Sequence, residues 1–373
     1  MLQSETMSTD PEPPPDAAGS FFSLTPERVL EAVEAGGLRA NPVCYPLNSF
    51  ENRVYEVELA DKSRVVAKFY RPGRWSREQI LEEHAFLAEL DAEEVPVCPV
   101  RPFPDGSTLK RIDGIEYSLS DRRGGRAPDE LSHLDLERLG MFAGRMHNVG
   151  ARRPAGSRPQ LTADRYVRDA LRRIAVQGSL TGPLRDRYFA VAEEIAEIAD
   201  RLLDGVAVHR IHADLHLGNV LFRDGELRVL DFDDMVTGPA VQDLWLALPG
   251  RGPEVEAMRD ALLAGYERFR DFDRSTLRLV EPLRGLRLVR YAGWLARRFD
   301  DPAFRAGWPH FGTADYWERE VADLEEQLEA VREAASSDTA AGTGGPAGAA
   351  VSSRPSSEEL LTNKDYFWDW EED

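Results

Sequence analysis

The segment from Val208 to Asp234, VHRIHADLHLGNVLFRDGELRVLDFDD, constrains the fold more than any other part of the chain. It contains two short apolar runs, NVLF and LRVL, joined by RDGE, a pattern typical of a tight β-hairpin. The sequence on either side has the apolar periodicity of amphipathic helices. A hairpin folds the residue that follows it back beside the residue that precedes it. We therefore expect Asn219 and Asp231 to lie in one site.

The histidines of this segment suggest a transition-metal site as one interpretation. His209, His212, Asp214 and His216 have a spacing that could supply several zinc ligands, and zinc needs three or four nitrogen, oxygen or sulfur atoms. Such sites usually recruit further ligands from later strands, but His310 is the only histidine downstream in the sequence. The alternative, in which the histidines only shape the loop, is therefore favoured.

Phosphoryl transfer fits the same segment better. That chemistry needs a carboxylate at the acceptor hydroxyl, oxygen ligands for Mg²⁺ and a lysine on the nucleotide phosphates. Asp214 and Asn219 have the D-x4-N spacing of a protein-kinase catalytic loop, and Asp231 follows in DFDD where kinases carry D-F-G. We expect Asp214 to orient or accept the hydroxyl proton, and Asn219 and Asp231 to ligate Mg²⁺. Asp233 or Asp234 could bind a second ion or only hold the turn.

The following segment, GPAVQDLW, contains Asp243, which could brace the catalytic loop from the next helix or merely cap that helix. The N-terminal half should supply the lysine. Lys68 lies in the apolar strand VVAKFY, and a helix follows that opens with the capping-box pair Ser76 and Gln79. On this helix Glu83 falls on the apolar seam, where it needs a cationic partner, and we expect that partner to be Lys68. Glu82 points to the side.

These elements predict an α+β class with a bilobal, protein-kinase-like fold: a small β-rich N-lobe and a large, mostly helical C-lobe. The N-lobe is expected over residues 21–123, with NRVYEVEL and SRVVAKFY forming a hairpin, and the C-lobe over residues 124–333. Residues 1–20 should be a disordered extension, and residues 334–373 a flexible linker with an acidic aromatic tail. No glycine-rich loop precedes Lys68, so polar groups of PLNSFENRVYEV would have to cover the phosphates.

Composition excludes several other classes. The formal net charge is −20, from 46 basic and 66 acidic residues, which argues against nonspecific binding to nucleic acid or an anionic membrane. No apolar run approaches the ~20 residues that span a bilayer. The chain has two cysteines, far apart, and no signal-peptide pattern at its start. We therefore expect a cytoplasmic protein, and a monomer.

Several segments resemble the bacterial stress response kinase A family, a protein-kinase-like branch near choline kinase and the aminoglycoside phosphotransferases. They include LNSFENRVYEV, VVAKFYRPGRW, QILEEHAFLAEL, HADLHLGNVLFRDG, DFDDMVTGPAVQDLW and EPLRGLRLVRY. The resemblance spans about Leu47 to Trp317. It implies ATP- and Mg²⁺-dependent phosphorylation of serine and threonine in proteins, including the chain itself, and a role in a stress response. By motif, Asp214 is then the proton acceptor, Asn219 and Asp231 the Mg²⁺ ligands, and Ser49 an ATP-site residue.

Other functions stay open at this level. A small-molecule kinase acting on an alcohol or aminoglycoside would use the same catalytic residues, and a pseudokinase adaptor or a metallohydrolase are further alternatives. The arginines of the segment LRGLRLVRYAGWLARRF could dock an acidic acceptor. We favour the interpretation that they form a solvated helix face, and the protein substrates are unidentified.

Overall fold

The structure is a computed structural model that describes residues 21, 24–47, 49–128, 130–248 and 250–336. The expected N-terminal extension and all but the first three residues of the expected linker and tail lie outside the described residues. The chain forms two compact units. The first combines the chain up to Pro128 with Ala155–Arg158 and Asn219–Met235. The second contains Asp129–Pro154, Pro159–Gly218 and the chain from Val236 onward.

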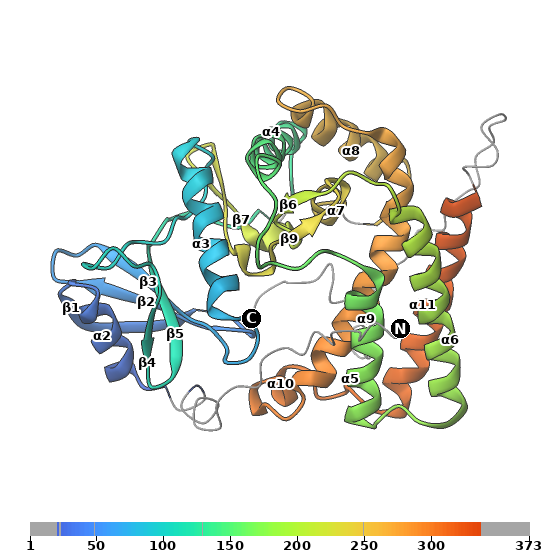
Figure 1. The fold of residues 1–373 in the computed structure, drawn as a ribbon, viewed down its shortest axis with the longest axis horizontal. Coiled ribbons are helices and arrows are strands. Elements are labelled where there is room, and N and C mark those ends of the chain that lie inside the picture. Colours follow the sequence, from blue (N-terminus) through green and yellow to red (C-terminus); the bar gives the residue numbers. More distant parts are fainter. Residues whose placement is uncertain (1–20, 22–23, 48, 129, 249, 337–373) are drawn as a thin grey trace, which may run out of the picture. The chain divides into compact units, whose positions relative to one another are not determined.

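The first unit is built on a five-stranded antiparallel sheet with the strand order β1-β2-β3-β5-β4 (Figure 1). Its elements are α2 (Pro26–Ala35), β1 (Ala40–Leu47), β2 (Arg53–Leu59), β3 (Arg64–Phe69), α3 (Arg77–Ala92), β4 (Lys110–Ile112), β5 (Ile115–Asp121), β7 (Val220–Arg223), β8 (Glu226–Val229) and the 3-10 turn η3 (Phe232–Asp234). The predicted β2–β3 hairpin is confirmed.

Helix α2 packs on one face of this sheet, and this packing determines where Lys68 points. Along β3, Val65, Ala67 and Phe69 are buried in the core that α2 completes with Val33. Because successive side chains of a strand point to opposite faces, Lys68 projects from the other face. The Lys68 side chain therefore lies on the face of the sheet opposite to α2 and its core cluster.

Helix α3 begins where its sequence predicts. The Ser76 side chain accepts a hydrogen bond from the backbone N–H of Gln79, and the Gln79 side chain accepts one from the backbone N–H of Ser76. The predicted hairpin after Asn219 is also present as β7 and β8. The backbone N–H of Leu230 donates to the carbonyl of Asn219 at 2.9 Å, so Asp231 follows directly after the residue that faces Asn219.

The second unit is mostly helical, with one two-stranded sheet formed by β6 and β9. Its elements are α4 (His133–Gly150), η1 (Asp164–Arg168), α5 (Asp169–Gln177), α6 (Gly182–Leu203), β6 (His209–Ile211), η2 (Leu217–Asn219, whose last residue belongs to the first unit), β9 (Val236–Gly238), α7 (Val241–Leu246), α8 (Pro253–Tyr266), η4 (Arg274–Leu279), α9 (Val280–Arg298), α10 (Pro302–Gly307) and α11 (Ala314–Ser336). The predicted α+β class is confirmed. Within the described ranges, no helix has both the length and the apolar character needed to cross a membrane.

Two glycines allow α4 and α8 to touch along their backbones. A Cβ added at Gly140 would lie 1.9 Å from the carbonyl oxygen of Leu262, and one at Gly265 would lie 2.0 Å from that of Glu137. No side chain fits in that space. This close crossing matters below because α4 carries His147 and α8 carries Tyr266, two residues that connect through Asp243 to the loop before Asp214.

Candidate active site

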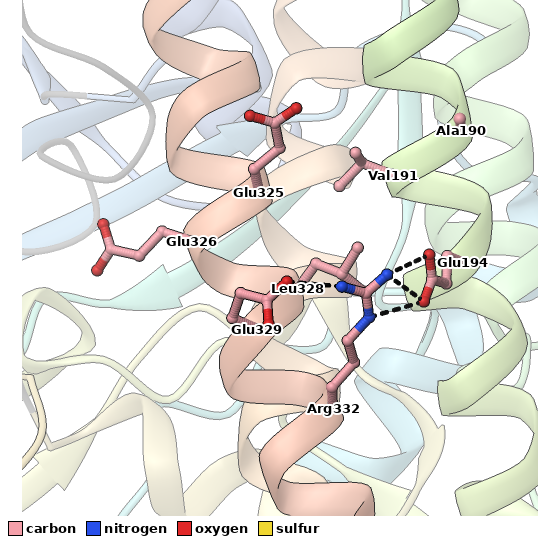
Figure 2. A pocket seen from close by; sticks show the side chains of 8 residues that line it. All are labelled: Ala190, Val191, Glu194, Glu325, Glu326, Leu328, Glu329 and Arg332. Carbon is pink, nitrogen blue, oxygen red and sulfur yellow. Dashed lines mark hydrogen bonds and ion pairs between the residues drawn. The ribbon is translucent and has the colours of Figure 1, made fainter. Parts of the chain in front are cut away.

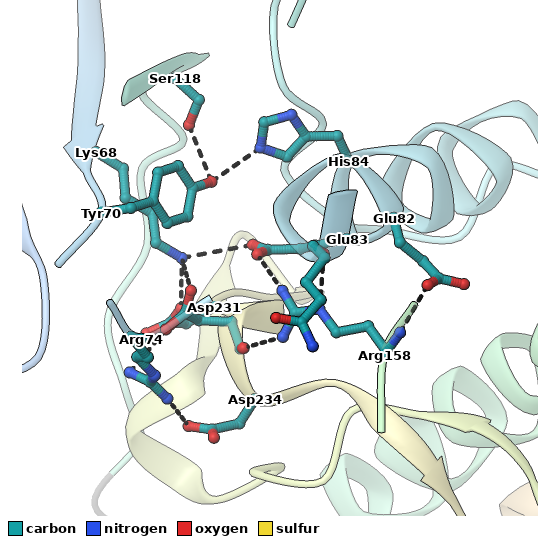
Figure 3. A network of polar contacts seen from close by, with 12 residues as sticks. Lys68, Tyr70, Arg74, Glu82, Glu83, His84, Ser118, Arg158, Asp231 and Asp234 are labelled. Atoms are coloured by element: carbon teal, nitrogen blue, oxygen red, sulfur yellow. Dashed lines mark hydrogen bonds and ion pairs between the residues drawn. The ribbon is translucent and has the colours of Figure 1, made fainter. Parts of the chain in front are cut away.

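A network of charged side chains, most of them buried, surrounds Lys68 in the first unit (Figure 3). The Lys68 Nζ atom lies 3.4 Å from Glu83 Oε1, 3.0 Å from Asp231 Oδ1 and 3.4 Å from Asp233 Oδ1. Burial alone would lower the pKa of Lys68, but the three carboxylates, Asp231 first, raise it well above its usual range. Lys68 is therefore held as a cation, and its expected pairing with Glu83 is present.

Asp233 is the most heavily paired carboxylate of the DFDD segment. It is buried, Arg74 approaches its Oδ2 atom at 2.8 Å, and the Asn52 side chain donates to the same atom at 3.2 Å. Arg74 also donates to Asp234 at 2.8 Å. Burial opposes ionisation of Asp233, yet Arg74 and then Lys68 hold its pKa below its ordinary range. Asp233 and Asp234 thus anchor the segment, which leaves Asp231 as its most exposed carboxylate.

Arg158 is a member of this network that the sequence did not reveal. Its side chain is fully buried and donates to Glu83 Oε2 at 2.9 Å, to the carbonyl of Asp233 at 2.5 Å and to the carbonyl of Gln79 at 2.8 Å. Its guanidinium carbon lies 4.3 Å from the centre of the Trp75 ring. Glu83 therefore has two cationic partners, one on each of its oxygens, and its position is fixed from both sides.

Glu82 is also buried and holds the short segment that delivers Arg158. Its carboxylate accepts hydrogen bonds from the backbone N–H groups of Gly156 at 2.5 Å, of Ser157 and of Arg158 at 2.8 Å. The expectation that Glu82 only points to the side of the helix missed this role. A carboxylate that accepts three N–H groups is a strong, charge-assisted anchor. Together Glu82 and Arg158 tie residues 156–158 to α3.

The segment between β1 and β2, expected to cover the phosphates, contains Ser49, which is half-buried. Arg71 holds this segment: its side chain donates to the carbonyls of Phe50 at 3.0 Å and Glu51 at 2.8 Å. The backbone N–H of Arg71 donates to the Asn52 side chain at 3.1 Å. Arg71 thus fixes the backbone of the segment between β1 and β2, which contains no glycine.

Asp231 has the backbone geometry of a specialised position. Its φ of 55° lies in the left-handed region, which non-glycine residues rarely adopt. Its side chain is 52% exposed, in contrast to the buried Asp233. Carboxylate and amide oxygens are ligands that Mg²⁺ accepts, so the pair formed by Asn219 and Asp231 fits that ion.

In the second unit, Asp214 follows Ala213, whose φ of 67° is also left-handed. Arg287 from α9 lies 2.7 Å from Asp214 Oδ1, and His216 Nε2 lies 3.5 Å from Asp214 Oδ2. Burial would raise the pKa of Asp214, but Arg287 and then His216 hold it well below its usual range. Asp214 is therefore an ionised acceptor of hydrogen bonds.

Asp243 braces this loop and does not cap its own helix. Its carboxylate accepts the backbone N–H of His212 at 2.9 Å and that of Ala213 at 2.6 Å. His147 Nε2 lies 3.0 Å from Asp243 Oδ2, and Tyr266 Oη lies 3.0 Å from His147 Nδ1. The close crossing of α4 and α8 therefore supports the left-handed turn before Asp214.

The histidines of the loop are used in its own hydrogen bonds. His212 Nδ1 accepts from the N–H of Asp214 at 3.2 Å, and His216 Nδ1 accepts from that of Gly218 at 3.0 Å. Burial lowers the pKa of His209 to about 2 and keeps it neutral. Across the described part of the chain, no three His, Cys, Asp or Glu side chains are grouped so as to hold a metal ion. The loop geometry thus favours histidines that shape the backbone.

The arginines of α9 were expected to form a solvated face, and the structure has all five of them half-buried. The arginines are Arg284, Arg287, Arg290, Arg297 and Arg298. Arg287 reaches Asp214, which the sequence gave no local reason to expect. The available signal was their concentration in one helix of an otherwise acidic chain.

Two hollows in the second unit differ in charge. A groove of about 520 Å³ between α6 and α11 is lined by Glu194, Glu325, Glu326 and Glu329 with Arg332 (Figure 2). Four carboxylates make it unsuited to nucleotide phosphates. A smaller hollow of about 270 Å³, bounded by α7, α8 and α9, is lined by apolar side chains such as Trp245, by arginines such as Arg284, and by Glu256 and Glu281.

Comparison with known proteins places this geometry in a family. The model of the phosphotransferase enzyme family matches residues 44–280. Stress response kinase A of Salmonella paratyphi A is 38% identical over 320 residues, which is 85% of this chain and 97% of the relative. The chain belongs to the phosphotransferase enzyme family and, within it, to the stress response kinase A family. The resemblance read from the sequence is therefore confirmed, and the chain is a kinase of this family.

Other relatives agree with that placement. Stress response kinase A of Escherichia coli K12 is 37% identical over 319 residues, 85% of this chain and 97% of the relative. The protein from Salmonella typhimurium named serine/threonine protein kinase RdoA is 37% identical over 320 residues with the same coverage. Two solved structures share the fold. The amicoumacin kinase hAmiN in complex with AMP-PNP and Ca²⁺ has a TM-score of 0.64 at 20% identity, covering 82% of this chain and 93% of its own. The microcompartment-associated aminopropanol kinase has a TM-score of 0.61 at 22% identity, covering 80% of this chain and 98% of its own.

Proposed function

We propose that the chain is an ATP- and Mg²⁺-dependent protein serine/threonine kinase that phosphorylates protein substrates and itself. The observation that carries this proposal is the contact of Lys68 with both Glu83 and Asp231. A lysine paired with a helix glutamate and with the aspartate after the hairpin is the arrangement in which kinases hold nucleotide phosphates. In this proposal Lys68 binds the phosphates, Glu83 positions Lys68, and Ser49 contacts the nucleotide.

The metal and the acceptor have separate residues. Asn219 and Asp231 would hold Mg²⁺, which supplies positive charge beside the transferring phosphoryl group. Asp214 orients the acceptor hydroxyl and takes its proton. The hydroxyl oxygen bonds to the γ-phosphorus, the bond between the γ-phosphorus and the bridging oxygen breaks, and ADP leaves with that oxygen. Because Asp214 is held ionised by Arg287, its carboxylate can accept the hydrogen bond of the acceptor hydroxyl before the transfer and its proton as the bond to phosphorus forms.

The choice of a protein acceptor is supported by the name of the Salmonella typhimurium relative at 37% identity. A cytoplasmic, monomeric enzyme acting in a stress response belongs to the same proposal. The second candidate is a small-molecule kinase, because the two similar solved structures carry the names of small-molecule kinases. The same catalytic residues would serve both reactions, and only the acceptor differs.

The test is phosphoryl transfer from ATP labelled at the γ-phosphate. The purified chain is incubated with Mg²⁺, alone and with a protein acceptor, beside an Asp214→Asn variant. Label on protein that is lost in the variant supports the kinase. Absence of ATP binding by the folded wild-type protein would refute the proposal, and label found only on an added aminoglycoside or amino alcohol would favour the second candidate.

A further inference from the structure

Asn52 is the last residue of the segment between β1 and β2, and it is buried, with 3% of its surface exposed. Its side chain makes a contact at each end. The amide oxygen accepts the backbone N–H of Arg71 at 3.1 Å, and the amide nitrogen donates to Asp233 Oδ2 at 3.2 Å. One side chain therefore connects three stretches of the first unit: the segment before β2, the loop after β3 and the turn η3.

The two partners of Asn52 require different hydrogen-bonding groups. The backbone N–H can only donate, whereas the carboxylate of Asp233, which Arg74 and Lys68 contact at 2.8 and 3.4 Å, accepts. A primary amide carries an acceptor and a donor on one planar group, so asparagine satisfies both partners at once. Aspartate would offer only acceptors, and alanine would remove both hydrogen bonds.

The segment between β1 and β2 is held by side chains because it contains no glycine. In a glycine-rich loop, the small residues allow backbone N–H groups to approach phosphates closely. Here Arg71 donates to the carbonyls of Phe50 and Glu51, and Arg74 lies 3.7 Å from the carboxylate of Glu51. The shape of this backbone is therefore set by contacts with the loop after β3.

The other partner of Asn52, Asp233, belongs to the turn that follows Asp231. Turn η3 begins directly after Asp231, whose φ of 55° leads the chain into it. Lys68 Nζ contacts Asp231 at 3.0 Å and Asp233 at 3.4 Å, and Figure 3 shows the first of these contacts. A displacement of Asp233 would therefore move the residue that we assign to Mg²⁺.

We propose that Asn52 is a positioning residue of this kinase, which holds the segment that covers the nucleotide phosphates against the turn that carries Asp231. The inference rests on the proposed function and adds a residue to its mechanism. Because the side chain is buried and directed at its two partners, Asn52 acts through Arg71 and Asp233. ATP without a metal uses only the segment, whereas MgATP uses the segment and Asp231 together. Loss of Asn52 should therefore reduce the gain in ATP affinity that Mg²⁺ provides.

The experiment measures the dissociation constant of ATP by titration calorimetry on the full-length chain, once with EDTA and once with saturating Mg²⁺. The ratio of the two constants is the gain in affinity due to the metal. Asn52→Ala should weaken MgATP binding about tenfold, the factor for one lost hydrogen bond to a charged group, and should weaken ATP binding in EDTA clearly less. In steady-state phosphoryl transfer, the same variant should raise KM for MgATP more than it lowers kcat.

Asn41→Ala is the matched control, because Asn41 also donates to a carboxylate on β2. Its amide nitrogen donates to Glu58 Oε1 at 2.8 Å and to the carbonyl of Leu59 at 3.0 Å. Glu58 lies near the far end of β2, about 20 Å of strand from Asn52. Both alanine variants should lower the urea midpoint of unfolding, but the control should leave both dissociation constants unchanged. A loss of stability alone therefore does not produce the expected result.

Each other outcome refutes a defined statement. Equal weakening of ATP binding with and without Mg²⁺ would overturn the inference, and so would wild-type constants in Asn52→Ala or the same losses in Asn41→Ala. If Asn52→Ala fails to fold, Asn52→Ser decides, because its shorter side chain cannot reach both partners and should reduce the metal-dependent gain in the same direction. All these results leave the kinase assignment intact. Wild-type protein that binds no ATP and transfers no phosphoryl group would instead refute the proposed function.

Discussion

Replacing Arg158 with alanine would remove one of the two cations that neutralise the buried carboxylate of Glu83. The Arg158 side chain is 0% exposed and that of Glu83 is 3% exposed. Breaking one partner of a buried ion pair costs about 3–5 kcal/mol, because it leaves a charge in a site that water does not reach. Lys68 remains 3.4 Å from Glu83, which places the expected loss of unfolding free energy near the lower limit, about 3 kcal/mol.

Urea unfolding of purified protein measures this loss, and Arg158→Ala should lower the midpoint with little change in slope. Two further variants give the comparison. Arg158→Lys keeps the charge but loses the forked geometry, and should fall between wild type and alanine. Arg28→Ala removes exposed ion pairs with Asp113 and Glu31, and should lower the urea midpoint much less than Arg158→Ala does. If Arg158→Ala costs no more than Arg28→Ala, the reasoning from the buried network is refuted.

Three further predictions concern catalysis and pH. Asp214→Asn should lower kcat about 10²- to 10⁴-fold in an ATP-consumption assay and leave ATP affinity within a few-fold, and full activity would refute its role at the acceptor. Lys68→Met should raise KM for ATP and lower kcat in the same assay, and unchanged kinetics would remove the lysine from the nucleotide site. Burial, with smaller contributions from Lys68 and Arg158, lowers the pKa of His84 to about 3. The unfolded chain therefore binds more protons between pH 6.5 and 3, so stability falls as pH drops through this range, by about 2 kcal/mol at pH 5. His84→Gln should flatten that slope in urea unfolding measured from pH 7 to 5, and an identical slope would contradict this origin.

The parts of the site that the sequence predicted are local in the chain. The D-x4-N spacing, the hairpin and Asp231 lie within 18 residues, and their geometry follows from backbone rules that operate over one turn. The pairing of Lys68 with Glu83 joins residues 15 apart, and helical periodicity alone distinguishes Glu83 from Glu82. Each of these signals can be read without knowing the fold.

The parts that the sequence did not predict depend on long-range contacts. Arg158 reaches Glu83 across 75 residues, and Glu82 reaches Gly156 across 74. Nothing in the sequence between α3 and Arg158 indicates which arginine contacts α3, because the chain has many arginines in similar local sequence. The contact between Arg287 and Asp214 is of the same kind. The excess of arginines in α9 can be seen in the sequence, but the contact of Arg287 with Asp214 cannot.

The first unit is assembled from three separate stretches of chain, and this has a practical consequence. A fragment that ends at Pro128 would contain Lys68, Glu83 and the whole five-stranded sheet, but it would lack Arg158 and the β7–β8 hairpin with Asp231. Its Glu82 carboxylate would have lost all three N–H donors from residues 156–158. Cloning at the apparent lobe boundary should therefore give a polypeptide with a sheet but no intact nucleotide site. A tag or split-protein junction belongs in an exposed loop within one stretch, not at the boundaries between stretches.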